Sequence, residues 1–235
     1  MVKTNALTFA LSMCLLVVGS LSAQTTVELR ASDGAALRGS YFAGRSGAPA
    51  ILLVHQCNMD RVAWRPIAEQ MAGLGFHVLT PDLRGFGENR LPGVTRVPSE
   101  KWGRDLDEWY DWLRSLTSVS RTAIAAGGAS CGVVETTLLA PRRPIRALIA
   151  ISGGTNLDGL RYVEGTPGTP VFGAAAEGDD AQGVRDLVAA SRHPASTVVV
   201  FPGSEHGTPL FLTHPELQAT LLRWTASVLD AFATR

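Results

Sequence analysis

The pattern of hydrophobic and polar positions divides the chain into alternating strands and helices. Continuous apolar runs of strand length cover residues 48–55, 76–80, 121–127, 145–151, 170–176 and 196–201. Such runs are typical of parallel strands buried on both faces of a sheet. Residues 25–30 and 37–42 instead alternate polar and apolar residues on either side of a Ser-Asp-Gly turn at 32–34. This alternation predicts an antiparallel hairpin at the start of the folded domain.

Apolar residues at helical spacing fill the gaps between these strands. They predict helices near residues 64–74, 102–116, 133–140 and 181–190. The last helix should open with Thr213 and Glu216 as a capping box and bury an apolar stripe of Leu217, Leu221, Trp224, Val228 and Phe232. Strands alternating with helices, with no linker or repeat, predict one α/β domain with a doubly wound, mostly parallel sheet.

Composition narrows the class of protein. The chain has 235 residues, 46% of them hydrophobic and 18% charged, which is enough for one globular domain with a full core. Lys+Arg and Asp+Glu balance at 21 each. This balance, without a basic run, argues against a nucleic-acid partner or an anionic membrane surface.

The first 23 residues have the pattern of a signal peptide. Lys3 precedes an apolar run at 6–19, and small residues lead to a cleavage point after Ala23. The run is short for a membrane span, although an uncleaved anchor is the alternative. Lipidation at Cys14 is disfavoured because Met13 is too large for a lipoprotein box. We therefore expect a mature domain at 24–235, exported to the periplasm or secreted, with no membrane contact after cleavage.

Two cysteines, Cys57 and Cys131, remain in the predicted mature chain. No C-x-x-C or H-x-x-x-H spacing accompanies them, so we expect no metal site.

The candidate nucleophile lies in a G-x-S-x-G motif, Gly128-Ala129-Ser130-Cys131-Gly132. An apolar run precedes the motif and a helical stretch follows it, so the connecting turn must be sharp. A serine at the apex of such a turn presents its hydroxyl to solvent. The alternative is an ordinary glycine-rich loop between a strand and a helix.

A serine nucleophile needs a base and a group that orients the base. The strand at 170–176 runs into Glu177-Gly-Asp-Asp180, and the strand at 196–201 runs into a loop that contains His206. Loops at the C-terminal ends of parallel strands cluster together. His206 is therefore the candidate base, and its alternative is a solvated loop histidine. Asp179 and Asp180 are the candidate acids.

In this order of serine, acid and histidine the chain resembles the α/β-hydrolase superfamily. His55 ends a strand where that family has His-Gly, and residues 82–87 match its D-x-R-G-x-G loop. The chain looks most similar to the compact dienelactone-hydrolase-like branch, which often has cysteine as nucleophile, so Ser130 argues against a dienelactone substrate. The resemblance implies that Asp179 orients His206, while Asp180 caps the next helix.

The resemblance also implies two backbone donors for an oxyanion hole. One is the N–H of Cys131, directly after the nucleophile, and the other is the N–H of Cys57 in the loop after the third strand. Gln56 stands where the family has glycine. Because the two backbones must converge, we predict a Cys57–Cys131 disulfide that fixes the hole, with two buried thiols as the alternative.

These predictions together describe an exported serine hydrolase that acts on a small-molecule ester or related acyl bond without metal or organic cofactor. Thioesterase, peptidase and lactone hydrolase are alternatives, as is a non-catalytic ligand-binding protein of the same fold. Only residues 152–169 separate two strands where a cap domain would be inserted, so we expect none. The site should therefore be open and lined by the loops at 86–101 and 154–169 and by residues 208–212. The oligomeric state is not predicted. Candidate substrate contacts, which ordinary packing would explain equally well, are Phe86, Trp102, Tyr162, Leu210 and Phe211.

Overall fold

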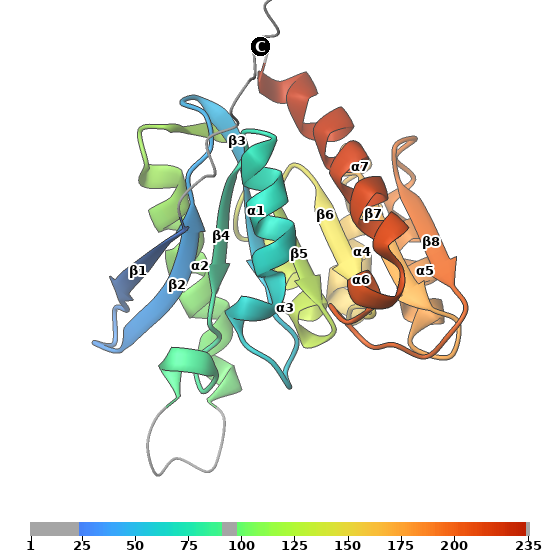
Figure 1. The fold of residues 1–235 in the computed structure, drawn as a ribbon, viewed down its shortest axis with the longest axis horizontal. Helices are drawn as coiled ribbons and strands as arrows, with labels where there is room; N and C mark the ends of the chain where they lie inside the picture. The colour runs from blue at the N-terminus through green and yellow to red at the C-terminus, as the bar shows by residue number, and fades with distance from the viewer. Residues whose placement is uncertain (1–23, 91–97, 234–235) are drawn as a thin grey trace, which may run out of the picture.

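The computed structural model describes residues 24–90 and 98–233. The predicted signal peptide, residues 1–23, lies outside this part of the chain. An eight-stranded sheet crosses the molecule between two layers of helices (Figure 1). None of the helices in the described ranges is both long and apolar enough to span a membrane.

The sheet has the strand order β1-β2-β4-β3-β5-β6-β7-β8. The hairpin strands β1 and β2 pair antiparallel, as does β2 with β4, and the remaining neighbours pair parallel. The strands are β1 Gln24–Arg30, β2 Ala36–Phe42, β3 Ala48–Val54, β4 His77–Pro81, β5 Val119–Ala129, β6 Leu148–Ile151, β7 Val171–Ala176 and β8 Thr197–Phe201. The predicted doubly wound sheet is confirmed. The strand order reverses beside β3 and β5, so the loops that follow these two strands meet at one edge.

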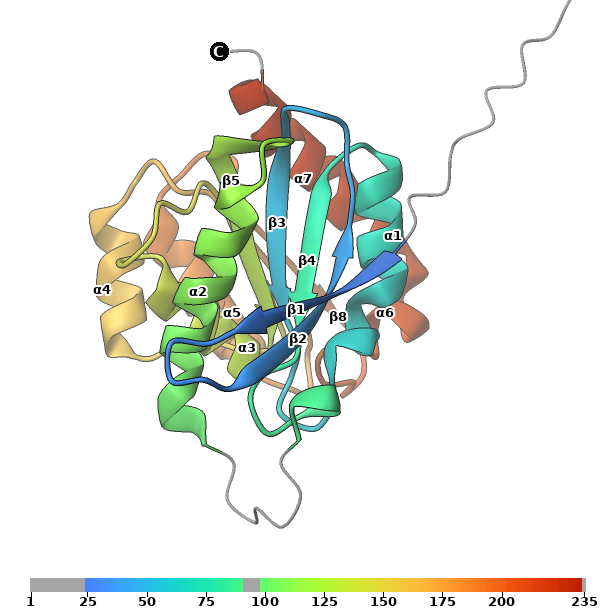
Figure 2. The same cartoon turned by 90° about the vertical axis from the view of Figure 1, so that its left-hand side faces the viewer.

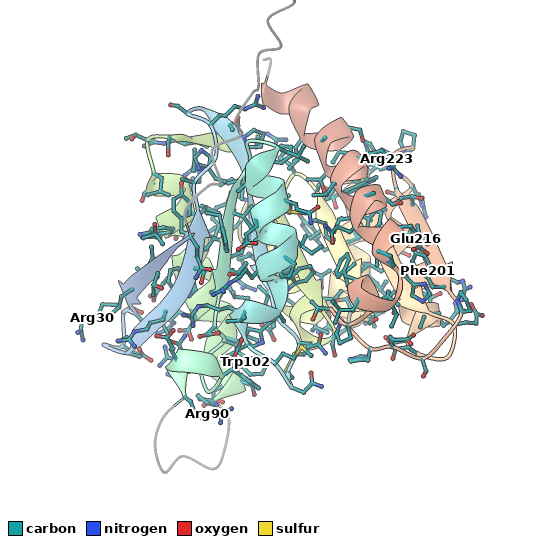
Figure 3. All side chains as sticks on the ribbon, in the orientation of Figure 1. Arg30, Arg90, Trp102, Phe201, Glu216 and Arg223 are labelled. Atoms are coloured by element: carbon teal, nitrogen blue, oxygen red, sulfur yellow. A yellow bond between two sulfur atoms is a disulfide. The ribbon has the colours of Figure 1, made fainter. Side chains whose placement is uncertain are left out.

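Helices cover both faces of the sheet (Figures 1 and 2). One layer contains α1 Arg65–Gly73, α6 Leu210–Thr213 and α7 Pro215–Ala233, and the other contains α2 Trp102–Ser115, α3 Cys131–Leu139, α4 Leu157–Gly165 and α5 Ala181–Ser191. Short 3-10 helices lie at η1 Arg61–Trp64, η2 Gly87–Asn89 and η3 Ser99–Lys101. Side chains fill the space between the sheet and each layer (Figure 3).

Each face of the sheet has its own apolar core. Trp64 and Met71 of the α1 side pack with Leu221 of α7, and Leu106 and Trp109 of α2 pack on the opposite face. These side chains are almost fully buried, and each such burial stabilises the fold by roughly 1.5–3 kcal/mol. The apolar residues that recur at helical spacing in the sequence are therefore the side chains with which each helix packs on the sheet.

Two details of the predicted elements are wrong. Residues 157–165 form helix α4 rather than loop, and the side chain of Asn156 caps this helix by accepting from the Gly159 N–H at 3.0 Å. Thr213 lies in α6 and its hydroxyl donates to the Leu210 carbonyl, so it does not open α7, which begins at Pro215. The helix between β6 and β7 is nine residues long, which leaves no cap domain there.

Candidate active site

The turn between β5 and α3 holds Ser130 in a strained conformation. Its φ is 51° and its ψ is −121°, a region that L-residues rarely adopt. Glycines permit the close packing around it: a Cβ on Gly128 would lie 2.1 Å from the carbonyl carbon of Gly132, and one on Gly132 would lie 2.5 Å from the Val54 carbonyl oxygen. The G-x-S-x-G residues thus form a tight elbow against the end of β3.

Asp179 and His206 form a hydrogen-bonded pair in the loops after β7 and β8. His206 Nδ1 lies 2.8 Å from Asp179 Oδ1 and 3.0 Å from Oδ2. The neighbouring parallel strands bring these loops together, because both end at the same edge of the sheet. With Nδ1 bound to the carboxylate, Nε2 is the nitrogen left to accept a proton.

Asp180 has a different environment from Asp179. Its Oδ1 accepts from the Gly183 N–H at 3.2 Å and caps α5, and its Oδ2 accepts from the Gly154 N–H at 3.0 Å. The predicted capping role of Asp180 is confirmed. The structure therefore brings Asp179, and not Asp180, to the histidine.

Ser130 and His206 line one cavity of about 540 Å³. Within the described residues no hydrogen bond joins the Ser130 hydroxyl to His206, and such contacts often tighten only when substrate binds. Small and polar groups form most of the wall, which includes Val134, residues 152–156, Asp180 and Gly183. Ser152 in this wall is buried and has φ 49°. The arrangement provides a hydroxyl, an imidazole and space for a small molecule.

Cys57 and Cys131 are joined by a disulfide, with their Cα atoms 5.9 Å apart. Cys131 is the first residue of α3, where backbone N–H groups have no partner within the helix. In the described part of the chain the Cys57 N–H donates to no other group. The bond therefore holds two free backbone donors near one another beside Ser130.

His55, directly after β3, connects two loops through hydrogen bonds of its ring. It is buried, and burial lowers its pKa. Its two ring nitrogens lie 2.8 Å from the Gln56 carbonyl oxygen and 2.9 Å from the Leu83 N–H. Nδ1 therefore donates and Nε2 accepts, which fastens the loop after β3 to the loop after β4.

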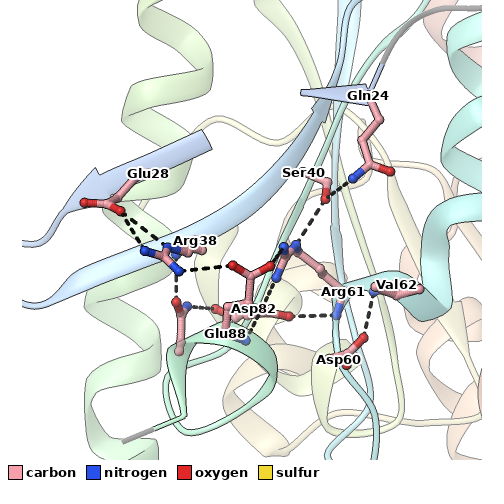
Figure 4. A network of polar contacts seen from close by, with 10 residues as sticks. Gln24, Glu28, Arg38, Ser40, Asp60, Arg61, Val62, Asp82 and Glu88 are labelled. Atoms are coloured by element: carbon pink, nitrogen blue, oxygen red, sulfur yellow. Dashed lines mark hydrogen bonds and ion pairs between the residues drawn. The ribbon is translucent and has the colours of Figure 1, made fainter. Parts of the chain in front are cut away.

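Asp82 and Arg84 of the D-x-R-G-x-G loop also stabilise the fold, through buried ion pairs. Asp82 is buried, accepts from the backbone N–H groups of Arg61 and Glu88, and pairs with the Arg61 guanidinium (Figure 4). Arg84 pairs with Asp33 and Asp105. These ion pairs fix the loop after β4 against η1 and α2.

None of the five predicted substrate contacts is among the residues that line the cavity around Ser130, and their role stays a prediction. Leu210 and Trp102 are buried in the two cores, and Phe86 and Tyr162 pack against one of them. Phe211 instead lines a separate apolar cavity of about 240 Å³ that Met59 and Leu212 share. The cavity wall contains residues 154–156, which belong to the predicted 154–169 lining. Ser152 and Gly153 in the same wall were not predicted, and their signal is the run of small residues that follows β6.

The sheet order, the strained serine and the acid–histidine pair define the class of α/β hydrolases. The chain belongs to this superfamily, since the family model described as alpha/beta hydrolase fold matches residues 49–170. An uncharacterized protein of Mycobacterium tuberculosis is 31% identical over 217 residues, which cover 82% of this chain and 75% of the relative. A thermostable monoacylglycerol lipase of Bacillus sp. is 28% identical over 120 residues, 51% of this chain and 46% of the lipase.

Solved structures share the fold at low identity. The esterase Pf2001 of Pyrococcus furiosus has a TM-score of 0.72 at 18% identity, covering 88% of this chain and 91% of the esterase. A dienelactone hydrolase-like promiscuous phosphotriesterase, P91, from metagenomic libraries has a TM-score of 0.62 at 16% identity, covering 88% and 99%. These likenesses extend the shared fold across nearly the whole described chain.

Proposed function

We propose that this protein is a serine hydrolase that cleaves carboxylic esters through an acyl-enzyme. The observation that carries the proposal is the Asp179–His206 hydrogen bond in a cavity that Ser130 also lines. The strained φ of Ser130 adds support, because such strain is common at functional sites. Relatives described as a lipase and as esterases agree with hydrolysis of an ester.

In the proposed mechanism the Ser130 hydroxyl attacks the ester carbonyl carbon while His206 Nε2 takes its proton. His206 then gives that proton to the leaving alcohol, and Asp179 stabilises the imidazolium through Nδ1. The N–H groups of Cys57 and Cys131 donate to the negative oxygen of the tetrahedral intermediate, and loss of one such donor costs about 3 kcal/mol. Water, activated by His206, then releases the acid and restores Ser130.

The cavity wall favours small, neutral acyl groups. Apart from Val134 it offers few large apolar surfaces, and it contains the carboxylate of Asp180 but neither Lys nor Arg. A substrate carboxylate would therefore meet like charge and no cation. We expect short-chain neutral esters to react faster than long-chain esters or esters of dicarboxylic acids.

A substrate panel tests the proposal. The panel consists of p-nitrophenyl esters graded by chain length, a hemisuccinate ester, a thioester, a lactone and a peptide amide, each with wild type and Ser130→Ala. The proposal expects the highest kcat/KM for a short neutral ester and a loss of several orders of magnitude in the variant. A higher value for the thioester, lactone or amide would reassign the substrate class, and equal rates in both proteins would move the nucleophile elsewhere.

We also propose that the mature protein works in an oxidising compartment outside the cytoplasm. Disulfides persist in exported proteins and are rare in the cytosol, so the Cys57–Cys131 bond supports export, as does the pattern of residues 1–23. Cell fractionation with N-terminal sequencing should find a chain that begins near Gln24. A cytoplasmic chain that retains residue 1 would contradict export.

A further inference from the structure

The side chain of Gln56 connects two loops of the candidate active site. It is 1% exposed and lies directly before Cys57, at the position where the family usually has glycine. Its Oε1 accepts from the Thr208 N–H at 2.8 Å and from the Thr208 hydroxyl at 3.2 Å. Its Nε2 donates to the His206 carbonyl at 3.3 Å and to Asn58 Oδ1 at 2.9 Å. One amide thus binds the peptides on both sides of Gly207.

Gly207 lets the two loops come this close. Its φ is 74°, and a Cβ on this residue would lie only 1.9 Å from Gln56 Oε1. The backbone that carries His206 is therefore packed directly on the Gln56 amide. The His206 side chain itself is 42% exposed, so packing contacts cover only part of it and contribute little to its position.

Together with the disulfide, Gln56 completes a connection between the three loops of the site. The Cys57–Cys131 bond ties the loop after β3 to the residue next to Ser130. Gln56 ties the same loop to His206, which is 150 positions later in the sequence. A displacement of about 1 Å at a reacting group can cost around 10²-fold in rate, so this connection bears on catalysis.

We propose that Gln56 is a positioning residue that holds the His206 loop in register with the Cys57 loop and, through the disulfide, with Ser130. The inference rests on the proposed function, in which His206 is the base. The family usually has glycine at this position. The positioning role of Gln56 depends on its amide, which has both a donor and an acceptor. Gln56 itself touches no reacting atom.

The test compares Gln56→Leu and Gln56→Glu with Asn58→Ala. The leucine variant removes all contacts of the amide, whereas the glutamate variant keeps the size and the acceptor for Thr208 but loses the donor to His206. Asn58→Ala is the matched control, because it removes only the exposed partner of the same amide. Reaction with a fluorophosphonate counts active sites, so that rates are expressed per competent site.

The decisive readout is the dependence on leaving group. A misplaced His206 protonates the leaving alcohol poorly, so an ethyl ester should suffer more than a p-nitrophenyl ester, whose leaving group needs little help. We expect both Gln56 variants to lose roughly 10-fold in kcat on the p-nitrophenyl ester and roughly 100-fold on the ethyl ester, with KM changed less than three-fold. Asn58→Ala should stay within two-fold of wild type on both esters.

Three outcomes are distinguishable. Equal losses on both esters, or fewer sites at a normal rate per site, would overturn the positioning role and leave a purely structural one. A Gln56→Glu variant that keeps wild-type kcat on the ethyl ester would also overturn it, and this variant serves if Gln56→Leu does not fold. If the wild-type protein does not react with the fluorophosphonate, the proposed function itself fails.

Discussion

Removal of the Cys57–Cys131 disulfide should destabilise the protein strongly. The bond closes a loop with a sequence separation of 74 residues. The chain-entropy model assigns about 3 kcal/mol to a 15-residue loop and about 4.7 kcal/mol to a 100-residue loop, so this bond should contribute about 4 kcal/mol to the free energy of unfolding. For a domain of this size each kcal/mol corresponds to about 2–4 °C, and Tm should fall by roughly 10 °C.

Urea unfolding followed by circular dichroism measures this loss. The oxidised wild type is compared with the reduced and alkylated protein and with the double variant Cys57→Ala and Cys131→Ala. Both altered forms should unfold at lower urea, and reductant should leave the double variant unchanged. A difference below about 1 kcal/mol from the oxidised protein would refute the calculation, since the model assigns about four times as much. Both alanines keep their backbone N–H groups, so any fall in kcat reports the geometry of the loops.

Three further predictions follow from individual contacts. Asp179→Asn should lower kcat by 10²–10⁴-fold, because His206 loses the partner that fixes its tautomer. Asp180→Asn should keep kcat within a few-fold of wild type and lower the free energy of unfolding by about 1 kcal/mol through loss of a helix cap. Ester assays and urea midpoints separate the two variants, and equal losses of activity would contradict the assignment of Asp179. Burial lowers the pKa of His55 in the folded state below its unfolded value of about 6.5, so the free energy of unfolding should fall as pH drops from 7 to 5. In His55→Asn the free energy of unfolding should depend less on pH. If the urea midpoint of this variant changes with pH as steeply as that of wild type, the assignment to His55 is refuted. Gly132→Ala should abolish folding or activity because its Cβ would meet the Val54 carbonyl at 2.5 Å, and near-normal activity would show that the elbow relaxes.

The sheet and the elbow could be predicted from sequence because their signals are local. Buried parallel strands require continuous apolar runs, and the strained turn at Ser130 requires small neighbours such as Gly128 and Gly132. Both are properties of adjacent residues. His206 and an acid at 179–180 also followed, since parallel strands end at one edge and leave few acids and histidines there, while the choice of Asp179 over Asp180 came from the family resemblance.

Helix α4, residues 152–153 of the cavity wall and the contacts of Gln56 could not be predicted in the same way. Helix α4 is only nine residues long and contains Gly159 and Gly165, so its helical signal is short. The wall residues at 152–153 are small and have no periodicity. Four of the candidate substrate contacts pack in or against the cores and Phe211 lines a separate cavity, so their role in substrate binding stays a prediction. Gln56 acts on a loop 150 positions away, and no local pattern encodes that distance.

The central claim is that Ser130 is the nucleophile, and peptide mass spectrometry after treatment with a fluorophosphonate tests it most directly. We expect one adduct per chain, on Ser130, formed slowly in His206→Ala and not at all in Ser130→Ala. An adduct on another residue, or labelling of Ser130→Ala at the wild-type rate, would contradict it.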